Sequence, residues 1–225
     1  VDTSDSFTSR FPAEGEANPL VVVITANAPA PGDLVINEIL YNDLGGDDLE
    51  YIELYNTTPN AIDLSYYRLE TFARRPFTIP QGSVIQGQGY LVLAWSEFGL
   101  RATYGLTSVP IVNWDALFSL VNAGDHIQLI HPNQYNPAGE SVAVESVRYI
   151  AGAPWPSNAQ TDPNPQDPNA TGASIELINP SFADRGTNGA RWRWTSYAVP
   201  ESTGVMGTPG AQNSMYSGVA DWTLY

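Results

Sequence analysis

Short apolar stretches separated by turn residues fill the chain from Asp33 onward. Most of them alternate apolar and polar residues or stay apolar over one strand length, and almost none shows a helical period. Only residues 97–104 have the pattern of a helix. The expected strands are residues 34–40, 50–55, 67–72, 90–94, 118–121, 126–130, 142–150, 174–178 and 191–196. This arrangement predicts an all-β protein, either a sandwich or a barrel.

The two ends of the chain differ from this pattern. Residues 1–18 are polar without a regular period, and the Pro-rich residues 27–32 are typical of an extended linker. Between them lies a β-branched run that predicts one strand, formed by Leu20, Val21, Val22, Val23, Ile24 and Thr25. We therefore expect an N-terminal arm at 1–32, a β-domain at 33–214 and a C-terminal tail at 215–225. The Pro-rich residues 151–172 predict a long surface loop, because proline cannot donate to a sheet ladder.

Composition narrows the classes of partner and chemistry. The 225 residues include 24 acidic and 9 basic side chains, all of the latter Arg, which gives a formal charge of −15. This charge disfavours nucleic acid and anionic membranes as partners. The absence of Cys excludes disulfides, thiolate metal sites and a Cys nucleophile. The longest apolar run, 20–24, is too short to cross a bilayer. Because the chain starts at Val1 without a signal sequence, we expect a removed signal peptide or a fragment of a longer chain.

Several motifs, taken in order, resemble the bacterial branch of the lamin tail domain family. They are LVINEILY at 34–41, EYIELYN at 50–56, IDLS at 62–65, a proline-to-glycine hairpin at 79–93, a Gly-Asp turn within 120–129, APWP at 153–156, ASIEL at 173–177, WR at 192–193 and GTPGAQNS at 207–214. The resemblance implies an immunoglobulin-like β-sandwich and a non-catalytic module of secreted or surface proteins. Tyr66 departs from the family pattern, which usually has Gly after the Asp-Leu-Ser turn.

An acidic loop near the start of the domain is the best metal candidate. Asp43, Asp47 and Asp48 surround two glycines and Glu50 follows, so four carboxylates could offer the oxygen ligands that Ca²⁺ takes. The spacing does not match an EF-hand, and a solvated acidic hairpin is the alternative. Apart from this candidate Ca²⁺ site, we expect no cofactor.

The search for catalytic residues yields none. His126 and His131 are five apart, which places them on opposite faces of a strand. Glu38 and Glu53 could be imagined as a glycosidase pair, but a structural role with Arg or backbone partners is favoured. No Gly-x-Ser-x-Gly elbow is present. We therefore expect a protein that is not an enzyme.

Aromatic residues and sequons offer two further binding or modification sites. Trp95, Trp192 and Trp194 could form a stacking platform for sugars, although a core stripe is favoured. Asn169 in the Pro-rich loop is the expected glycan acceptor, whereas Asn56, in the other sequon, is expected to be structural.

The ends of the chain carry the functional expectation. The run at 20–25 has the composition of a strand that adds to a sheet edge, and Trp222, Leu224 and Tyr225 give the tail the same character. We expect an extracellular or cell-surface structural subunit that self-assembles into a homo-oligomer or filament by strand addition. Two alternatives remain: residues 20–25 pair within their own sandwich, or the chain is a binding or anchoring module of a larger secreted protein, with a carbohydrate or protein ligand.

Overall fold

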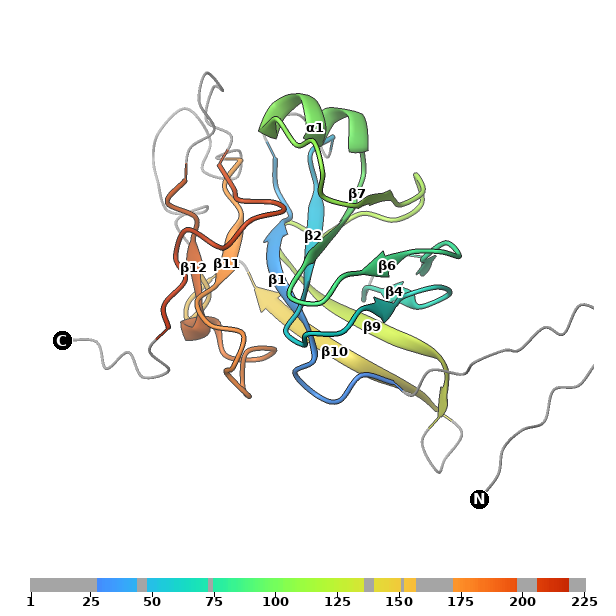
Figure 1. The fold of residues 1–225 in the computed structure, drawn as a ribbon. Helices are drawn as coiled ribbons and strands as arrows, with labels where there is room; N and C mark the ends of the chain where they lie inside the picture. The colour runs from blue at the N-terminus through green and yellow to red at the C-terminus, as the bar shows by residue number, and fades with distance from the viewer. Residues whose placement is uncertain are drawn as a thin grey trace, which may run out of the picture.

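The computed structural model describes residues 28–43, 48–72, 75–135, 140–150, 152–156, 172–197 and 206–218. These residues form three sheets and one short α-helix (Figure 1). The elements are β1 (Leu34–Leu40), β2 (Tyr51–Asn56), β3 (Ile62–Asp63), β4 (Arg68–Glu70), β5 (Phe77–Thr78), β6 (Val84–Ile85), β7 (Tyr90–Ala94), α1 (Glu97–Tyr104), β8 (Ile111–Asn113), β9 (Gly124–Tyr135), β10 (Ser141–Ile150), β11 (Ile175–Leu177), the 3-10 helix η2 (Gly189–Arg191) and β12 (Trp192–Trp194).

A six-stranded sheet with the order β12-β11-β1-β2-β7-β8 forms one layer. All seven residues of β1 are buried, as expected for a central strand covered on both faces. Neighbouring strands are antiparallel except β8, which runs parallel to β7 at one edge. The predicted strands at 34–40 and 90–94 and the helix at 97–104 are confirmed, and β2 is shifted by one residue from the prediction.

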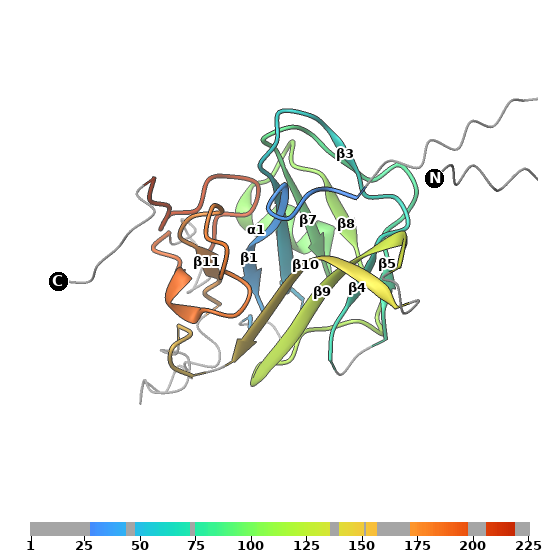
Figure 2. The same ribbon diagram turned by 90° about the horizontal axis from the view of Figure 1, so that it is seen from below.

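A four-stranded sheet, β10-β9-β4-β5, forms the second layer. Seen from below, the long hairpin of β9 and β10 lies across the six-stranded sheet (Figure 2). The apolar side chains between the two layers belong to one buried cluster, which includes Ile36, Ile52, Leu69, Ile127 and Val147. The described residues therefore form an all-β sandwich, as the apolar pattern predicts.

The predicted strand at 118–121 is wrong. The Phe118 N–H donates to the Asp115 carbonyl at 3.0 Å, which closes a turn. The Phe118 ring is fully buried, with its centroid 4.9 Å from that of Trp114, and Leu120 is also buried. These residues are apolar because they fill the core from a loop, and not because they pair in a sheet.

The helix is short but has a clear start and end. The Ser96 side chain accepts the Gly99 N–H at 3.0 Å, and Gly105 ends the helix with φ of 67°. Leu100 packs into a second buried cluster with Leu40, Tyr51, Val92 and Ala94. At eight residues the helix is too short to cross a membrane, and no helix in the described part of the chain is long and apolar enough to do so.

At Tyr66, where the family usually has Gly, the backbone keeps the conformation that glycine favours. Tyr66 has φ of 66°, a left-handed conformation that glycine adopts without steric cost, and its side chain is half exposed.

In the Pro-rich stretch, Trp155 is buried with its ring centroid 5.7 Å from that of Trp192, so this part of 151–172 belongs to the core and not to a surface loop.

The predicted arm strand at 20–25, the tail residues Trp222, Leu224 and Tyr225, and the glycan acceptor Asn169 lie outside the described residues.

Candidate functional site

Three buried glutamates form a row across adjacent strands of the six-stranded sheet. Glu38 on β1 is paired in register with Glu53 on β2 and with Glu176 on β11. Each of the three is fully buried. Side chains directly opposite one another in a sheet lie close together and on one face, so this glutamate row gathers three acidic groups in one place.

A segment from the far end of the domain covers the glutamate row. We call residues 207–215 the closing segment. Glu38 Oε1 accepts hydrogen bonds from the hydroxyls of Tyr51, at 2.6 Å, and Ser174, and from the Thr208 N–H at 2.8 Å. Glu38 Oε2 lies 3.2 Å from the Thr208 hydroxyl, within hydrogen-bond distance. Only glycine fits at Gly207, because a Cβ there would lie 2.5 Å from the Tyr51 hydroxyl.

Glu53 is held entirely by N–H donors. Its Oε1 accepts from the Asn37 side-chain amide at 2.8 Å, and its Oε2 accepts from the Gly210 backbone N–H. Asn37 is fixed in turn by Asn213, since the two amides exchange hydrogen bonds at 2.7 Å and 3.2 Å. The closing segment therefore contributes both a backbone donor and an amide side chain to this end of the row.

Glu176 completes the row. Its Oε1 accepts from the Thr208 hydroxyl at 2.9 Å, and its Oε2 accepts from the Ser214 hydroxyl and the Met215 N–H, both at 2.8 Å. Every carboxylate oxygen of the row thus has a hydrogen-bond partner, and the Thr208 hydroxyl, which has one proton, lies between Glu38 Oε2 and Glu176 Oε1. The row joins β11, β1 and β2 to the closing segment, which makes it a structural centre of this layer.

Burial and mutual repulsion change the acidity of the row. Burial, followed by the charge of Glu176, raises the pKa of Glu38 to about 7, and burial and the charge of Glu38 raise the pKa of Glu53 well above its usual range. Both oxygens of Glu53 face N–H groups that can only donate, whereas the Thr208 hydroxyl beside Glu38 Oε2 can also accept. We therefore place the proton that relieves the repulsion on Glu38.

The arrangement does not suit the glycosidase pair that the sequence raised. Glu38 and Glu53 are fully enclosed, and a glycosidase pair needs a cleft between its carboxyl groups. The structural role is correct, and of the two expected kinds of partner it is the backbone that serves, through the N–H groups of Thr208 and Gly210. Within the described residues, the buried Arg185 instead binds Glu145 with two hydrogen bonds, at 3.1 Å and 2.5 Å.

The carboxylates of the acidic loop that the structure describes, those of Asp43, Asp48 and Glu50, do not form a cluster. Asp43 is buried and accepts the Leu49 N–H at 2.7 Å, while Glu50 is buried and accepts the Leu120 N–H at 3.1 Å. Asp48 is exposed, and Asp47 lies outside the described residues. No group of three or more Asp, Glu or His side chains within the described ranges could hold a metal ion. Calcium binding here stays a prediction.

The histidines and tryptophans also have local partners. His131 is buried edge-on against Tyr67, and His126 Nε2 bonds the Ser146 hydroxyl at 2.8 Å. Trp192 is fully buried, and Trp95 and Trp194 pack against the same core, so these rings form no surface platform for sugars. The core alternative is the correct one.

The sequon residue Asn56 is buried and structural, as expected. Its amide donates to the carbonyls of Asn60 and Gln86 at 2.7 Å and 3.0 Å.

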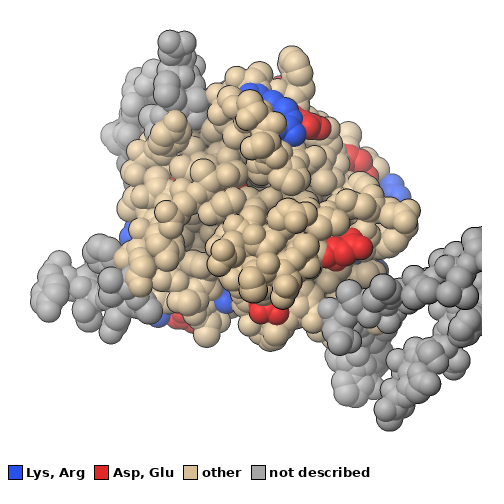
Figure 3. Space-filling view, in the orientation of Figure 1, with Lys and Arg blue, Asp and Glu red and all other residues tan. Residues whose placement is uncertain are grey.

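The surface carries two hollows of interest. One, of about 90 Å³, is lined by the rings of Tyr55, Tyr90 and Tyr216 and by amide side chains, including Gln212. The other, of about 180 Å³, lies where β9 begins and β10 ends. Charged side chains are scattered over the face shown in Figure 3 and form no single patch on it.

Comparison with known proteins gives one match. A family model described as Lamin Tail Domain, a family of immunoglobulin-like, non-enzymatic domains, matches residues 27–150, over half of the chain. No curated protein matches. The matched range contains β1 through β10, whereas Glu176 and the closing segment follow it.

Proposed function

We propose, from the premise that this chain belongs to the lamin tail domain family, that it is a non-catalytic structural module of an extracellular or cell-surface assembly, in which copies join by strand addition. The observation that carries the proposal is the open edge of the six-stranded sheet at β8. A strand from a neighbouring copy would extend the sheet there.

Hydrogen bonding along β8 shows which backbone groups face outward. The Pro110 carbonyl accepts from the Val92 N–H, and the Trp114 N–H donates to the Ala94 carbonyl. The backbone N–H and carbonyl groups of the even-numbered residues of this segment therefore face β7. The backbone groups of Ile111 and Asn113 therefore face away from the sheet. Among the described residues, no strand pairs with them. Such an edge can accept a further strand.

The opposite edge of the same sheet is blocked. On β12, the Arg193 guanidinium donates to the carbonyl of Trp192 at 2.7 Å and to that of Ala190 at 3.1 Å. A charged side chain folded over its own edge strand is one way in which proteins prevent unwanted pairing. The contrast supports β8, and not β12, as the edge that takes an added strand.

The sequence supplies a candidate for the added strand. The β-branched run at 20–25 precedes a Pro-rich linker, which would give the strand reach. The absence of Cys suits the proposed extracellular location, because no thiol is exposed to an oxidising environment. Addition of this run to β8 of another copy would be head to tail, and such contacts give open filaments when they do not close into rings.

Negative-stain microscopy and light scattering of the full chain test the proposal. We expect oligomers or filaments that are lost when residues 1–26 are deleted, and equally lost in Ile111→Pro, which removes an outward N–H and leaves the bonds to β7 in place. Thermal unfolding of both variants verifies that the sandwich remains folded. A wild-type protein that stays monomeric at high concentration would contradict the proposal.

The tyrosine hollow favours a second candidate function, a binding module for neutral sugars. Tyr55 and Tyr90 stack with their ring centroids 4.9 Å apart, and Tyr216 and Gln212 are exposed beside them. Rings with uncharged polar groups suit a ligand that has both apolar faces and hydroxyls. A titration of the full chain and of Tyr216→Ala with soluble oligosaccharides, followed by tyrosine fluorescence, tests this candidate.

A further inference from the structure

A single hydroxyl group of the closing segment lies between two carboxylates of the glutamate row. Thr208 Oγ1 is 3.2 Å from Glu38 Oε2 and 2.9 Å from Glu176 Oε1. A threonine hydroxyl has one proton to donate, so it satisfies both oxygens only when one of the two carboxyl groups is itself protonated. A proton on Glu38 Oε2 completes the chain, because Glu38 then donates to Thr208, and Thr208 donates to Glu176. The hydrogen bonds at this end of the closing segment therefore require one bound proton.

The titratable groups around Glu38 are acidic or neutral. Glu53 and Glu176 lie beside it on the neighbouring strands β2 and β11. Tyr51, also on β2, donates its hydroxyl proton to Glu38 Oε1 at 2.6 Å, and Tyr104 of α1 meets Tyr51 edge-on, with ring centroids 6.1 Å apart. Burial and the charge of Glu38 raise the pKa of both phenols above its usual range, so both stay neutral around pH 7.

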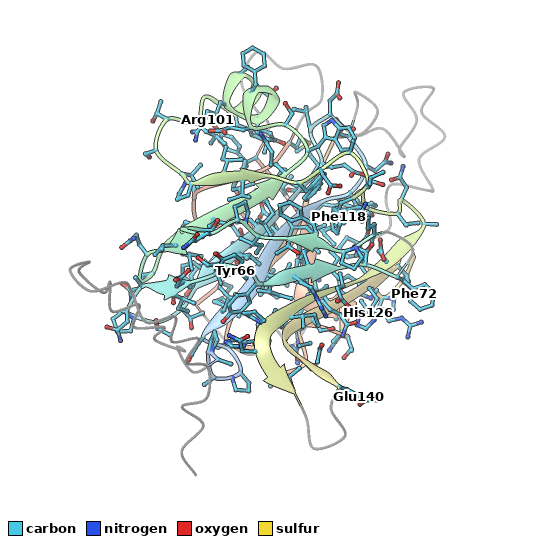
Figure 4. All side chains as sticks on the ribbon, turned by 90° about the vertical axis from the view of Figure 1, so that its right-hand side faces the viewer. Tyr66, Phe72, Arg101, Phe118, His126 and Glu140 are labelled. Atoms are coloured by element: carbon cyan, nitrogen blue, oxygen red, sulfur yellow. The ribbon has the colours of Figure 1, made fainter. Side chains whose placement is uncertain are left out.

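No cation in the described part of the chain pairs with the row. The Arg101 guanidinium on α1 donates to Glu97 Oε1 at 2.7 Å and to the carbonyls of Leu106 and Val109 at 3.3 Å and 3.2 Å. Figure 4 shows Arg101 beside α1, at one end of the molecule. None of the ion pairs between described residues includes a glutamate of the row. A negative charge on Glu38 therefore meets no cation that would offset it.

The closing segment is held to the sandwich mainly by polar contacts. Its N–H groups at Thr208, Gly210 and Met215 all donate to carboxylates of the row. Pro209 is the only buried apolar side chain among residues 207–215. Segments with few buried apolar contacts open locally at a lower cost in free energy than the core does. Opening of this segment therefore breaks mainly its bonds to the row and exposes little apolar surface.

We propose that the closing segment opens when Glu38 loses its proton. The ionised carboxylates of Glu38 and Glu176 then compete for the single proton of the Thr208 hydroxyl and repel each other across it. Opening brings water to the row, which relieves both the repulsion and the burial of charge. Gln212 and Asn213 of the same segment line the tyrosine hollow, so the hollow is complete only while the segment is closed. This consequence for binding rests on the second candidate function, whereas the opening itself does not.

The direction of the pH effect follows from the acidity of Glu38. Its pKa is about 7 in the closed state and returns toward 4.5 when water reaches it. The closed state therefore binds the proton more tightly than the open state. Its advantage is complete below about pH 4.5 and is lost as the pH rises through about 7. Measurements at pH 5 and pH 8 include most of this change.

Hydrogen exchange of the full chain, followed by mass spectrometry, tests the proposal. After correction for the intrinsic exchange rate, peptides that cover residues 206–218 should be protected at least about tenfold more strongly at pH 5 than at pH 8. Peptides from the β9–β10 hairpin report unfolding of the sandwich, and at pH 8 they should stay more strongly protected than residues 206–218. The exchange needs no ligand, so its outcome is separate from that of the oligosaccharide titration.

Two variants assign the effect to Glu38. Glu38→Gln is uncharged at both pH values, and its amide can donate to the Thr208 hydroxyl while its oxygen accepts from Tyr51, so residues 206–218 should keep at pH 8 most of the protection that they have at pH 5. Glu97→Gln is the matched control, because Glu97 pairs with Arg101 outside the row, and it should respond to pH like the wild type.

Three results would overturn the proposal. The first is equal protection of residues 206–218 at pH 5 and pH 8. The second is equal exchange of this segment and the β9–β10 hairpin at pH 8, which would show that the whole sandwich unfolds. The third is a pH effect that remains unchanged in Glu38→Gln.

Discussion

Buried carboxylates occur in two settings in this molecule, and their hydrogen bonds differ. In the glutamate row, both oxygens of Glu38, Glu53 and Glu176 have hydrogen-bond partners that the fold brings to them. At the larger hollow, Asp125 has one oxygen with two donors and one oxygen with none among the described residues. The two settings are similar in burial, so burial alone does not identify a functional carboxylate.

The difference lies in where the donors come from. The glutamate row is served by the closing segment, whose backbone and hydroxyl groups are themselves fixed by the same bonds. Such a network is internally complete and serves the fold. The remaining oxygen of Asp125 is shielded from solvent, and the residue opposite Asp125 on β10 is the core residue Tyr149. A buried acceptor without a donor costs free energy, whereas the glutamate row has its donors built into the fold.

Removal of one member of the glutamate row should have the largest effect. Glu176→Ala leaves the Met215 N–H without its acceptor, removes one acceptor each from the Thr208 and Ser214 hydroxyls, and opens a cavity under the closing segment. We expect a loss of about 4 kcal/mol in the free energy of unfolding, measured by urea titration. The control is Glu97→Ala, which removes only a part-exposed i,i+4 ion pair with Arg101 and should cost less than about 0.5 kcal/mol.

The acidity of the row predicts an unusual pH dependence. Because the pKa of Glu38 rises from 4.5 to about 7 on folding, the folded state binds more protons than the unfolded state between these values. The free energy of unfolding should therefore fall as the pH rises from about 4.5 to 7, by on the order of 3 kcal/mol from this group. Thermal unfolding at pH 5 and pH 8 measures the change.

Glu38→Gln isolates the contribution of Glu38. The glutamine oxygen can still accept from Tyr51, Ser174 and Thr208, and its amide can donate to the Thr208 hydroxyl, so the variant should fold as well as the wild type at pH 8. The fall in stability between pH 5 and pH 8 should be smaller in this variant. An equal fall in both proteins would assign the effect to other groups, such as the summed acidic charge.

The sequence predicts the long elements of the fold well, for local reasons. The strand Leu34–Leu40 is apolar at five of its seven positions, and the helix Glu97–Tyr104 is flanked by a Ser cap and a Gly end. Strands β3, β5, β6 and β8 have two or three residues each, too few for a period to appear. They exist because neighbouring strands provide hydrogen bonds, which is tertiary information.

The candidate site was only partly predictable. Glu38 and Glu53 stand out as single charges within apolar strand segments, and Glu176 carries the same signal within residues 173–177. The donors of the closing segment could not be found this way, since Thr208 lies 170 residues from Glu38. Asp125 stands in a sequence typical of a turn, and only the packing of Phe72 and Arg148 around it forms the hollow.

The most direct test compares one isosteric change in each setting, by urea unfolding of Glu53→Gln and Asp125→Asn. Both oxygens of Glu53 face N–H donors, so the glutamine amide must oppose one of them, and we predict a loss of about 2 kcal/mol. Asp125→Asn keeps the oxygen that accepts from Phe72 and His126 and changes the one that has no donor, so its stability should stay within about 0.5 kcal/mol of the wild type. Equal losses in the two variants would contradict the distinction between a carboxylate whose two oxygens both have donors and one that has an oxygen without a donor.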